Sequence, residues 1–152
     1  MNDDASGSGN DTRSFNEKII DEFRANDGRV GGPFEGAPVL LLHSTGARSG
    51  VERVNPMMYQ ALDGGAAAVF ASNAGADSHP AWYHNVVANP DVSAEVGATT
   101  RHYRARVATP DERDPIWAKQ KRDYPGFAEY EAATARVIPV VLLEPAPGRD
   151  PR

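Results

Sequence analysis

The chain has 152 residues, of which 40% are hydrophobic and 24% are charged, and this composition is typical of one globular domain. Its formal net charge of −5 argues against a general nucleic-acid binder, and its lack of cysteine excludes disulfides, thiolate nucleophiles, Cys-ligated zinc and iron–sulfur clusters. Redox chemistry in such a chain requires a bound organic cofactor.

The two ends differ in composition from the middle. Residues 1–14 are rich in Gly, Ser, Asn and Asp and predict a disordered leader, and residues 146–152 predict a flexible tail. The folded domain is therefore expected over residues 15–145. The acidic, polar start does not have the profile of a signal peptide, and no apolar run reaches the roughly 18 residues of a membrane-spanning helix, so we expect a cytoplasmic protein.

A helix and three strands are predicted in the first half of this domain. Apolar residues at helical spacing from Phe15 to Phe23 predict an amphipathic helix that ends near Asn26. Apolar or alternating runs then predict strands over residues 39–43, 53–62 and 66–72, joined by short Gly-containing turns. Within the second strand, Pro56 indicates an irregularity or an unpaired edge.

The second half continues the alternation of strands and helices. A helix is predicted to begin at His79-Pro80 and to run to Ala88. Strands over 92–96 and 102–108 precede a helix that Thr109 caps and that runs to Asp123. The predicted elements that remain are a short helix after Gly126 and a last strand over 137–144, in which Pro139 suggests an edge or a bulge. The turns between the first strands are too short for parallel crossovers, so the pattern predicts an α+β fold with a small barrel or curled sheet.

Several catalytic motifs are absent from the sequence. It contains no G-x-G-x-x-G motif after a strand, no phosphate-binding G-x-x-x-x-G-K-[ST] loop and no G-x-S-x-G nucleophile elbow. His79 and His84 are five residues apart and do not share a helix face, and no metal site is predicted.

The turn over residues 44–53 is the first candidate binding segment. Gly46 and Gly50 permit a tight turn whose amides face outward, and Arg48, Ser49 and Arg53 add two guanidinium groups and a hydroxyl. Such a turn would hold a phosphodiester or a polycarboxylate. The alternative is an ordinary hairpin turn with solvated arginines.

The second candidate segment covers residues 71–85. Its small residues leave room for a planar ligand, and it leads into a helix N-terminus, which favours anions. Trp82 and Tyr83 are adjacent, so one is expected in the core and the other beside a pocket, while Asn85 is suited to tie the loop. A purely structural loop is the alternative.

Three aromatic residues form the third candidate segment. Tyr124, Phe127 and Tyr130 are spaced so that a helix would present them as one stripe. Such a stripe usually belongs to the core, but the polar and loop-forming neighbours of these residues favour partial exposure.

Together these segments resemble the deazaflavin-dependent nitroreductase and quinone reductase family, whose members use coenzyme F-420 and adopt a split β-barrel. The likeness covers most of residues 15–145. It is carried, in chain order, by Arg24-x-Asn26-Asp27-Gly28, Gly31-Gly32, Thr45-Gly46 with Gly50, Arg53 to Pro56, Asp63 to Gly65, Ala71-Ser72, Trp82-Tyr83, Tyr124-Pro125 and Ile138 to Val141.

The resemblance implies a split β-barrel of about six mainly antiparallel strands, with inserted and flanking helices. It implies hydride transfer from reduced coenzyme F-420 to a quinone, a nitroaromatic or another conjugated acceptor. The implied cofactor-binding residues are Ala47, Arg48, Ser49, Arg53, Pro56, Met57, Phe70, Ala71, Ser72, Asn73, Ala81, Trp82, Tyr83, His84, Asn85 and Phe127. The implied substrate residues are Tyr124, Phe127 and Tyr130, with Ser72 and Tyr130 as the catalytic candidates.

Two departures from the family pattern bear on function. Asn73 stands where the family often has lysine, which removes a cation from the tail-binding region, and Phe127 stands where the best-known nitroreductase of the family has tyrosine. The second departure argues against activation of bicyclic nitroimidazoles and leaves quinone reduction open. The alternatives kept open are a non-catalytic carrier of the deazaflavin or a lipid-like ligand, a flavin mononucleotide or haem binder on a similar barrel, and loose peripheral contact with a membrane.

Overall fold

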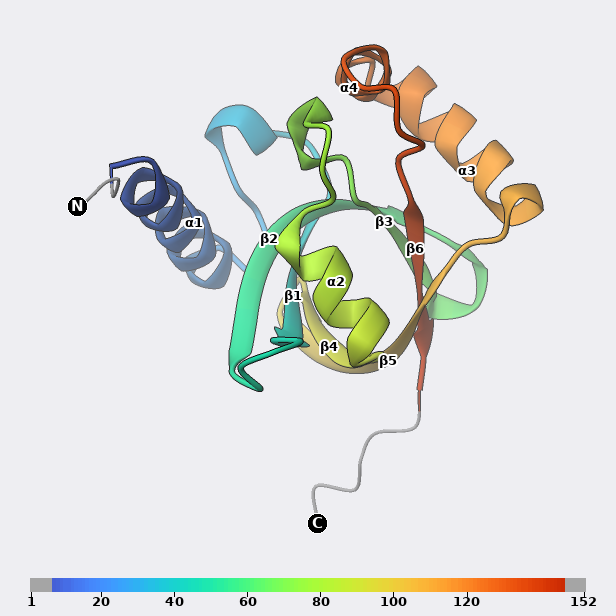
Figure 1. Cartoon of the computed structure of the whole chain (residues 1–152). Coiled ribbons are helices and arrows are strands. Elements are labelled where there is room, and N and C mark those ends of the chain that lie inside the picture. The colour runs from blue at the N-terminus through green and yellow to red at the C-terminus, as the bar shows by residue number, and fades with distance from the viewer. Residues whose placement is uncertain (1–6, 147–152) are drawn as a thin grey trace.

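The computed structural model describes residues 7–146, and it describes side chains over residues 15–146 with the exception of Pro33. The described residues form a six-stranded barrel with four α-helices (Figure 1). In chain order the elements are α1 (Gly7–Ala25), β1 (Val39–Thr45), β2 (Glu52–Ala61), β3 (Ala67–Phe70), α2 (Ala81–Ala88), β4 (Asp91–Val96), β5 (Thr99–Val107), α3 (Pro110–Asp123), α4 (Gly126–Ala132) and β6 (Val140–Pro145).

The barrel is closed, with the strand order β1-β2-β3-β6-β5-β4 and antiparallel pairing throughout. This confirms the predicted α+β fold and its six mainly antiparallel strands. The hairpin connections β1–β2, β2–β3 and β4–β5 follow from the Gly-containing turns, whereas β1–β4 and β3–β6 pair segments that lie far apart in the sequence.

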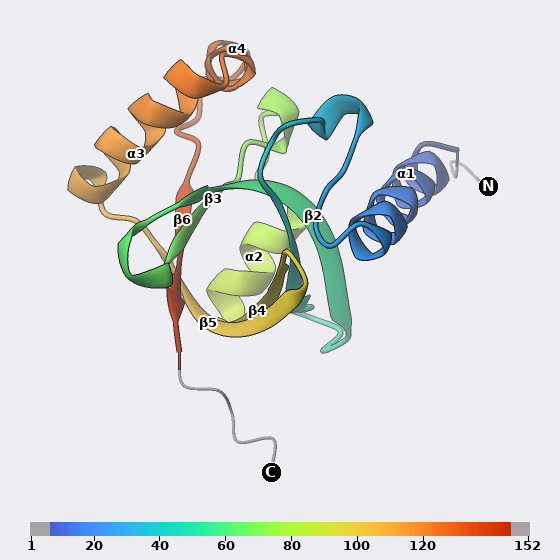
Figure 2. The ribbon, with the colours of Figure 1, turned by 180° about the vertical axis from the view of Figure 1, so that it is seen from behind.

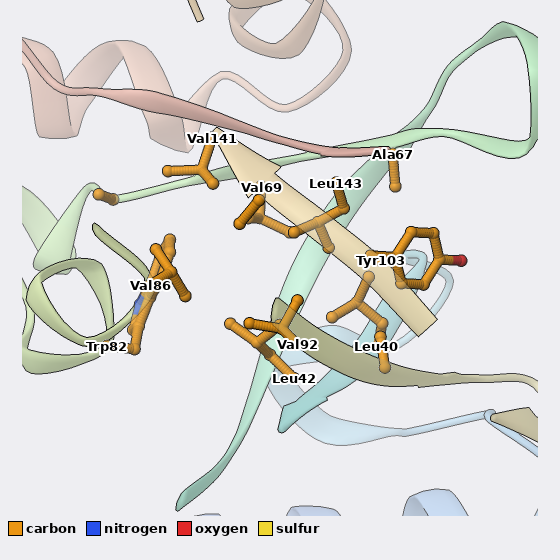
Figure 3. Packing of buried hydrophobic residues seen from close by; sticks show 13 residues of the cluster. Leu40, Leu42, Ala67, Val69, Trp82, Val86, Val92, Tyr103, Val141 and Leu143 are labelled. Atoms are coloured by element: carbon orange, nitrogen blue, oxygen red, sulfur yellow. The ribbon is translucent and has the colours of Figure 1, made fainter. Parts of the chain in front are cut away.

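The barrel interior is filled by apolar side chains that alternate along the strands. Leu40 and Leu42 of β1 and Val141 and Leu143 of β6 point inward and are buried (Figure 3). Helix α2 lies across one end of the barrel, in front of it in Figure 1 and visible through it in Figure 2, and it contributes Trp82 and Val86 to the same cluster. The interior is therefore a packed core rather than an open channel.

The other helices cover the outside of the barrel. Helices α3 and α4 pack over β3 and β6, where Phe70, Trp117 and Phe127 form a second buried cluster, and α1 packs over β1 and β2 through Ile19 and Phe23. Helix α3 begins with a capping box in which Thr109 and Glu112 satisfy each other's backbone amides, as its sequence predicts. No helix within residues 7–146 has the length and apolar character to cross a bilayer.

The structure differs from the sequence predictions at several element ends, most at the start of α1 and at the start of the last strand. The composition of residues 7–14 predicts disorder, but they form the first part of α1, while residues 1–6 lie outside the described residues. The last strand begins at Val140 and not at Val137, because Pro139 has no amide to give to a ladder.

Pro56 lies inside β2 without breaking the barrel. It is paired with Leu41 of β1, but among the described residues β2 pairs with β3 only over Tyr59–Ala61. Pro56 therefore sits where β2 has one neighbouring strand, which is the local unpaired edge that its sequence position indicates.

Candidate functional site

Two arginines lie at the β1–β2 hairpin, Arg48 in the turn and Arg53 at the start of β2. Its backbone is closed by hydrogen bonds from Gly46 N–H to Val51 O at 2.9 Å and from Gly50 N–H to Gly46 O at 3.0 Å. The side chains of Arg48 and Arg53 are exposed, and neither has a hydrogen bond or ion pair with another residue of the described chain. Their guanidinium groups are thus not occupied by another group of the described chain.

A side chain of α2 holds this turn in place. Asn85 Oδ1 accepts a hydrogen bond from Ala47 N–H at 2.9 Å, and Asn89 Nδ2 donates to Thr45 O at 3.3 Å. The two bonds join α2 to the end of β1. The Ala47 amide is therefore used inside the protein, and Ser49 Oγ accepts a hydrogen bond from Val51 N–H at 3.1 Å within the same turn.

The first turn of α2 separates core from surface as its sequence indicates. Trp82 is buried in the barrel cluster, whereas Tyr83 is half-buried and Ala81 and His84 are exposed. The Trp82 ring is therefore part of the barrel core.

Arg136 organises the loop between β3 and α2. Its guanidinium donates to Ala71 O at 3.1 Å, to Ser72 O at 3.0 Å and to Ala76 O at 2.9 Å, and it lies 2.8 Å from Nδ1 of His79. Burial, together with the charge of Arg136 and the nearby His84, holds the pKa of His79 below its ordinary value. The half-buried guanidinium of Arg136 thus holds three carbonyls and one imidazole in place.

The same loop packs against α4. Gly75 has a φ of +82°, and a Cβ atom placed there would lie 3.0 Å from Ala133 Cβ and 3.1 Å from Tyr130 O, so only glycine fits. Ser72 and Tyr130, predicted as the catalytic pair, are therefore on segments that adjoin. Asn73 points its side-chain amide to Ser78 O at 3.1 Å, so this residue stiffens the loop.

The aromatic stripe is divided between core and edge. Phe127 is only 8% exposed and its ring lies 5.5 Å from that of Phe70 and 6.1 Å from that of Trp117, whereas Tyr124 and Tyr130 are half-buried. The partial exposure favoured by the sequence is found for the two tyrosines and not for Phe127. The Phe127 side chain points from α4 into the cluster that Phe70 of the barrel and Trp117 of α3 form. Met57 likewise packs against the barrel cluster.

Neither Arg136 nor a hydrogen-bonding role of His79 was predicted from the sequence. The partners of Arg136 lie 57 to 65 residues away from it in the sequence. The available signal was an isolated arginine among small residues, just before a predicted strand that is itself buried.

Comparisons with known proteins identify the family of the chain. A family model described as F420H(2)-dependent quinone reductase matches residues 17–145. The chain is 38% identical over 127 residues to an F420H(2)-dependent quinone reductase of Mycobacterium tuberculosis, and the match covers 80% of this chain and 83% of that one.

Solved structures give the same result. A structure of an F420-H2 dependent reductase, FDR-A, is 40% identical, covers 70% of this chain and 94% of its own, and superposes with a TM-score of 0.64. A second structure, described as a domain-swapped dimer, is 35% identical, covers 91% of this chain and 100% of its own, and has a TM-score of 0.66.

Proposed function

The chain belongs to the F420H(2)-dependent quinone reductase family, and we propose that it is an oxidoreductase that transfers a hydride from reduced coenzyme F-420 to a quinone. The observation that carries the proposal is the Asn85–Ala47 hydrogen bond of 2.9 Å. It joins the turn with two unpaired arginines to the helix that follows the Ser72 loop, so that one ligand can span both.

The residues present fit such a cofactor. An anionic tail would bind Arg48 and Arg53, which lack protein partners within the described chain, with Ser49 between them. A planar ring would lie along residues 70–73 and 81–85, with further contacts from Pro56, Met57, Phe70 and Phe127. Because the side chains of Phe70 and Phe127 are buried, these two residues would contact the ring through their backbone. When bound, reduced coenzyme F-420 supplies the hydride, and the protein needs no nucleophile of its own.

The remaining roles fall to hydroxyl groups near the loop. Ser72 and Tyr130 are proposed to donate hydrogen bonds to the acceptor oxygen on which negative charge develops, and Tyr124 and Tyr130 to form an acceptor wall that excludes water. Phe127 would act from beneath this wall, since its ring lies 5.4 Å from that of Tyr130.

The preferred acceptor is proposed to be a quinone rather than a nitroaromatic compound. Phe127 has no hydroxyl to donate to a nitro group, and the two half-buried tyrosines offer flat apolar surface with a donor at the rim. A cytoplasmic location and loose contact with membranes remain predictions, and sedimentation with phospholipid vesicles tests the second.

The direct test of function is a reduction assay. We expect the purified protein to reduce menadione with reduced coenzyme F-420 and to show no such activity with NADH or NADPH alone. Binding of the oxidised cofactor without any turnover would instead favour the carrier reading, and NADPH-driven turnover would contradict the proposal.

A second expectation concerns the anionic tail. Arg48→Ala and Arg53→Ala should each raise the Kd of oxidised coenzyme F-420 by about tenfold or more, since a charge-assisted hydrogen bond contributes roughly 1.5–3 kcal/mol. The measurement is a fluorescence titration, with Arg101→Ala, an exposed arginine on β5, as the matched control. Unchanged affinity in both variants would place the tail elsewhere.

A further inference from the structure

A pocket lies beside Tyr83, on the side of α2 that faces α3 and β6. It has a volume of about 510 Å³ and is enclosed by the start of α2, the end of β5, the start of α3 and the segment that leads into β6. This volume is within the range of small-molecule sites. Its apolar lining includes Val107, which is 42% exposed, and Val137, which is 69% exposed. These side chains would gain free energy if an apolar ligand covered them.

His79 gives the pocket a hydrogen-bond donor of fixed orientation. A guanidinium has no acceptor and keeps its protons, so the 2.8 Å contact with Arg136 Nη1 requires that His79 Nδ1 accepts. The imidazole proton therefore resides on Nε2, which has no partner among the described residues. The ring is also held by Tyr83, with ring centroids 4.6 Å apart.

A second donor lies on the wall formed by α3. Arg113 lines the pocket, and its Nε is anchored to Ile138 O at 2.9 Å. Its guanidinium carbon lies 5.2 Å from the centre of the Trp117 ring, which holds the group further. Asp114 also lines the pocket, and its Oδ1 lies 3.7 Å from Nη1 of Arg113. With its apolar residues and the N–H groups of His79 and Arg113, the pocket suits an apolar ring that carries carbonyl oxygens and an aliphatic substituent.

The pocket is connected to the candidate site by one side chain. The guanidinium that orients His79 also donates to the carbonyls of Ala71 and Ser72. The His79 side chain and the Ser72 loop are consequently held by the same group, so a ligand bound against His79 lies next to the predicted reaction site.

We propose that this pocket is an acceptor subsite, in which His79 Nε2–H donates a hydrogen bond to a carbonyl of the quinone and Val107, Val137 and Pro139 contact its aliphatic substituent. The inference rests on the proposed function. In the overall reaction the quinone takes up the hydride and one proton from solvent to become a hydroquinone. His79 keeps its own proton and is a binding and positioning residue.

The first test uses the apolar wall. Val137→Asp is compared with Val87→Asp, because Val87 is 56% exposed on α2 and does not line the pocket. The probes are menadione and a 2-methyl-1,4-naphthoquinone with a short isoprenoid substituent, and binding is read without cofactor from the quenching of tryptophan fluorescence. We expect Val137→Asp to raise the Kd of the substituted quinone about tenfold, and Val87→Asp to leave it within about twofold.

The second test uses the donor. His79→Phe keeps a ring and removes the N–H, whereas His79→Gln keeps a neutral donor at similar reach. We expect His79→Phe to raise the KM for both quinones by about fivefold or more, His79→Gln to restore most of this loss, and neither variant to change the Kd of oxidised coenzyme F-420.

The outcomes separate the subsite from the function. If the wild type reduces menadione but quinone Kd and KM are unchanged in Val137→Asp and His79→Phe, the subsite is wrong and the function stands. If the variants weaken quinone binding but the wild type shows no reduction with the reduced cofactor, the subsite stands and the function fails. Thermal melting confirms that each variant is folded.

Discussion

Arg136→Ala is expected to lower the free energy of unfolding by about 2–4 kcal/mol, because hydrogen bonds to a charged group contribute roughly 1.5–3 kcal/mol each and buried carbonyls would lose their donor. Ala71 is fully buried and Ser72 is 9% exposed, so water cannot easily replace the guanidinium at these carbonyls. The free energy is measured by urea denaturation followed by circular dichroism.

The same substitution is expected to weaken cofactor binding at least tenfold, because the loop over residues 71–79 would lose the group that orders it. Arg136→Lys serves as the conservative variant, and it should recover only part of the loss, since an ammonium has three donors and Arg136 contacts four acceptors. Arg122→Ala is the matched control, as this side chain is 70% exposed. Wild-type stability and affinity in Arg136→Ala would show that the loop holds its own shape.

Phe127→Ala is expected to destabilise the fold by about 3–5 kcal/mol, which is the usual cost of removing a buried aromatic side chain and leaving a cavity. The reason lies in its neighbours, since the rings of Phe70, Trp117 and Tyr130 surround it between the barrel and helices α3 and α4. The midpoint of urea unfolding measures the change.

Tyr130→Phe is the control that separates stability from chemistry. Tyr130 is half-buried, and its hydroxyl makes no hydrogen bond within the described chain. This variant should therefore melt like the wild type, while quinone turnover falls. Should Phe127→Ala instead remain fully stable with altered turnover, the ring would belong to the acceptor wall and not to the core.

The order of strands and helices was predictable from the sequence because it depends on local patterns. Alternating apolar residues, the turn at Asp63–Gly65 and the cap at Thr109 each act within a few residues. The start of α1 at Gly7 was not predictable in this way, since the composition of residues 7–14 is typical of disordered chain.

The candidate site was predictable only in part. The turn with Arg48 and Arg53 and the division between Trp82 and Tyr83 follow from local sequence, and the structure brings Asn85 to this turn. The four contacts of Arg136 and the pocket at His79 arise only when β3 and β6 become neighbours in the closed barrel. Such contacts depend on the three-dimensional fold and not on any nearby residue pattern.

The place of β6 in the barrel has a consequence for how the chain folds. This strand follows every other described strand and helix in the sequence, yet it lies between β3 and β5. Its residue Leu143 pairs with Ala67 of β3 on one side and with Ala105 of β5 on the other. Until β6 inserts, β3 and β5 each present an open edge with unpaired amides and carbonyls, which is the state most prone to aggregate. Because closing the barrel depends on pairing between strands that are distant in the sequence, we expect refolding on the scale of milliseconds to seconds.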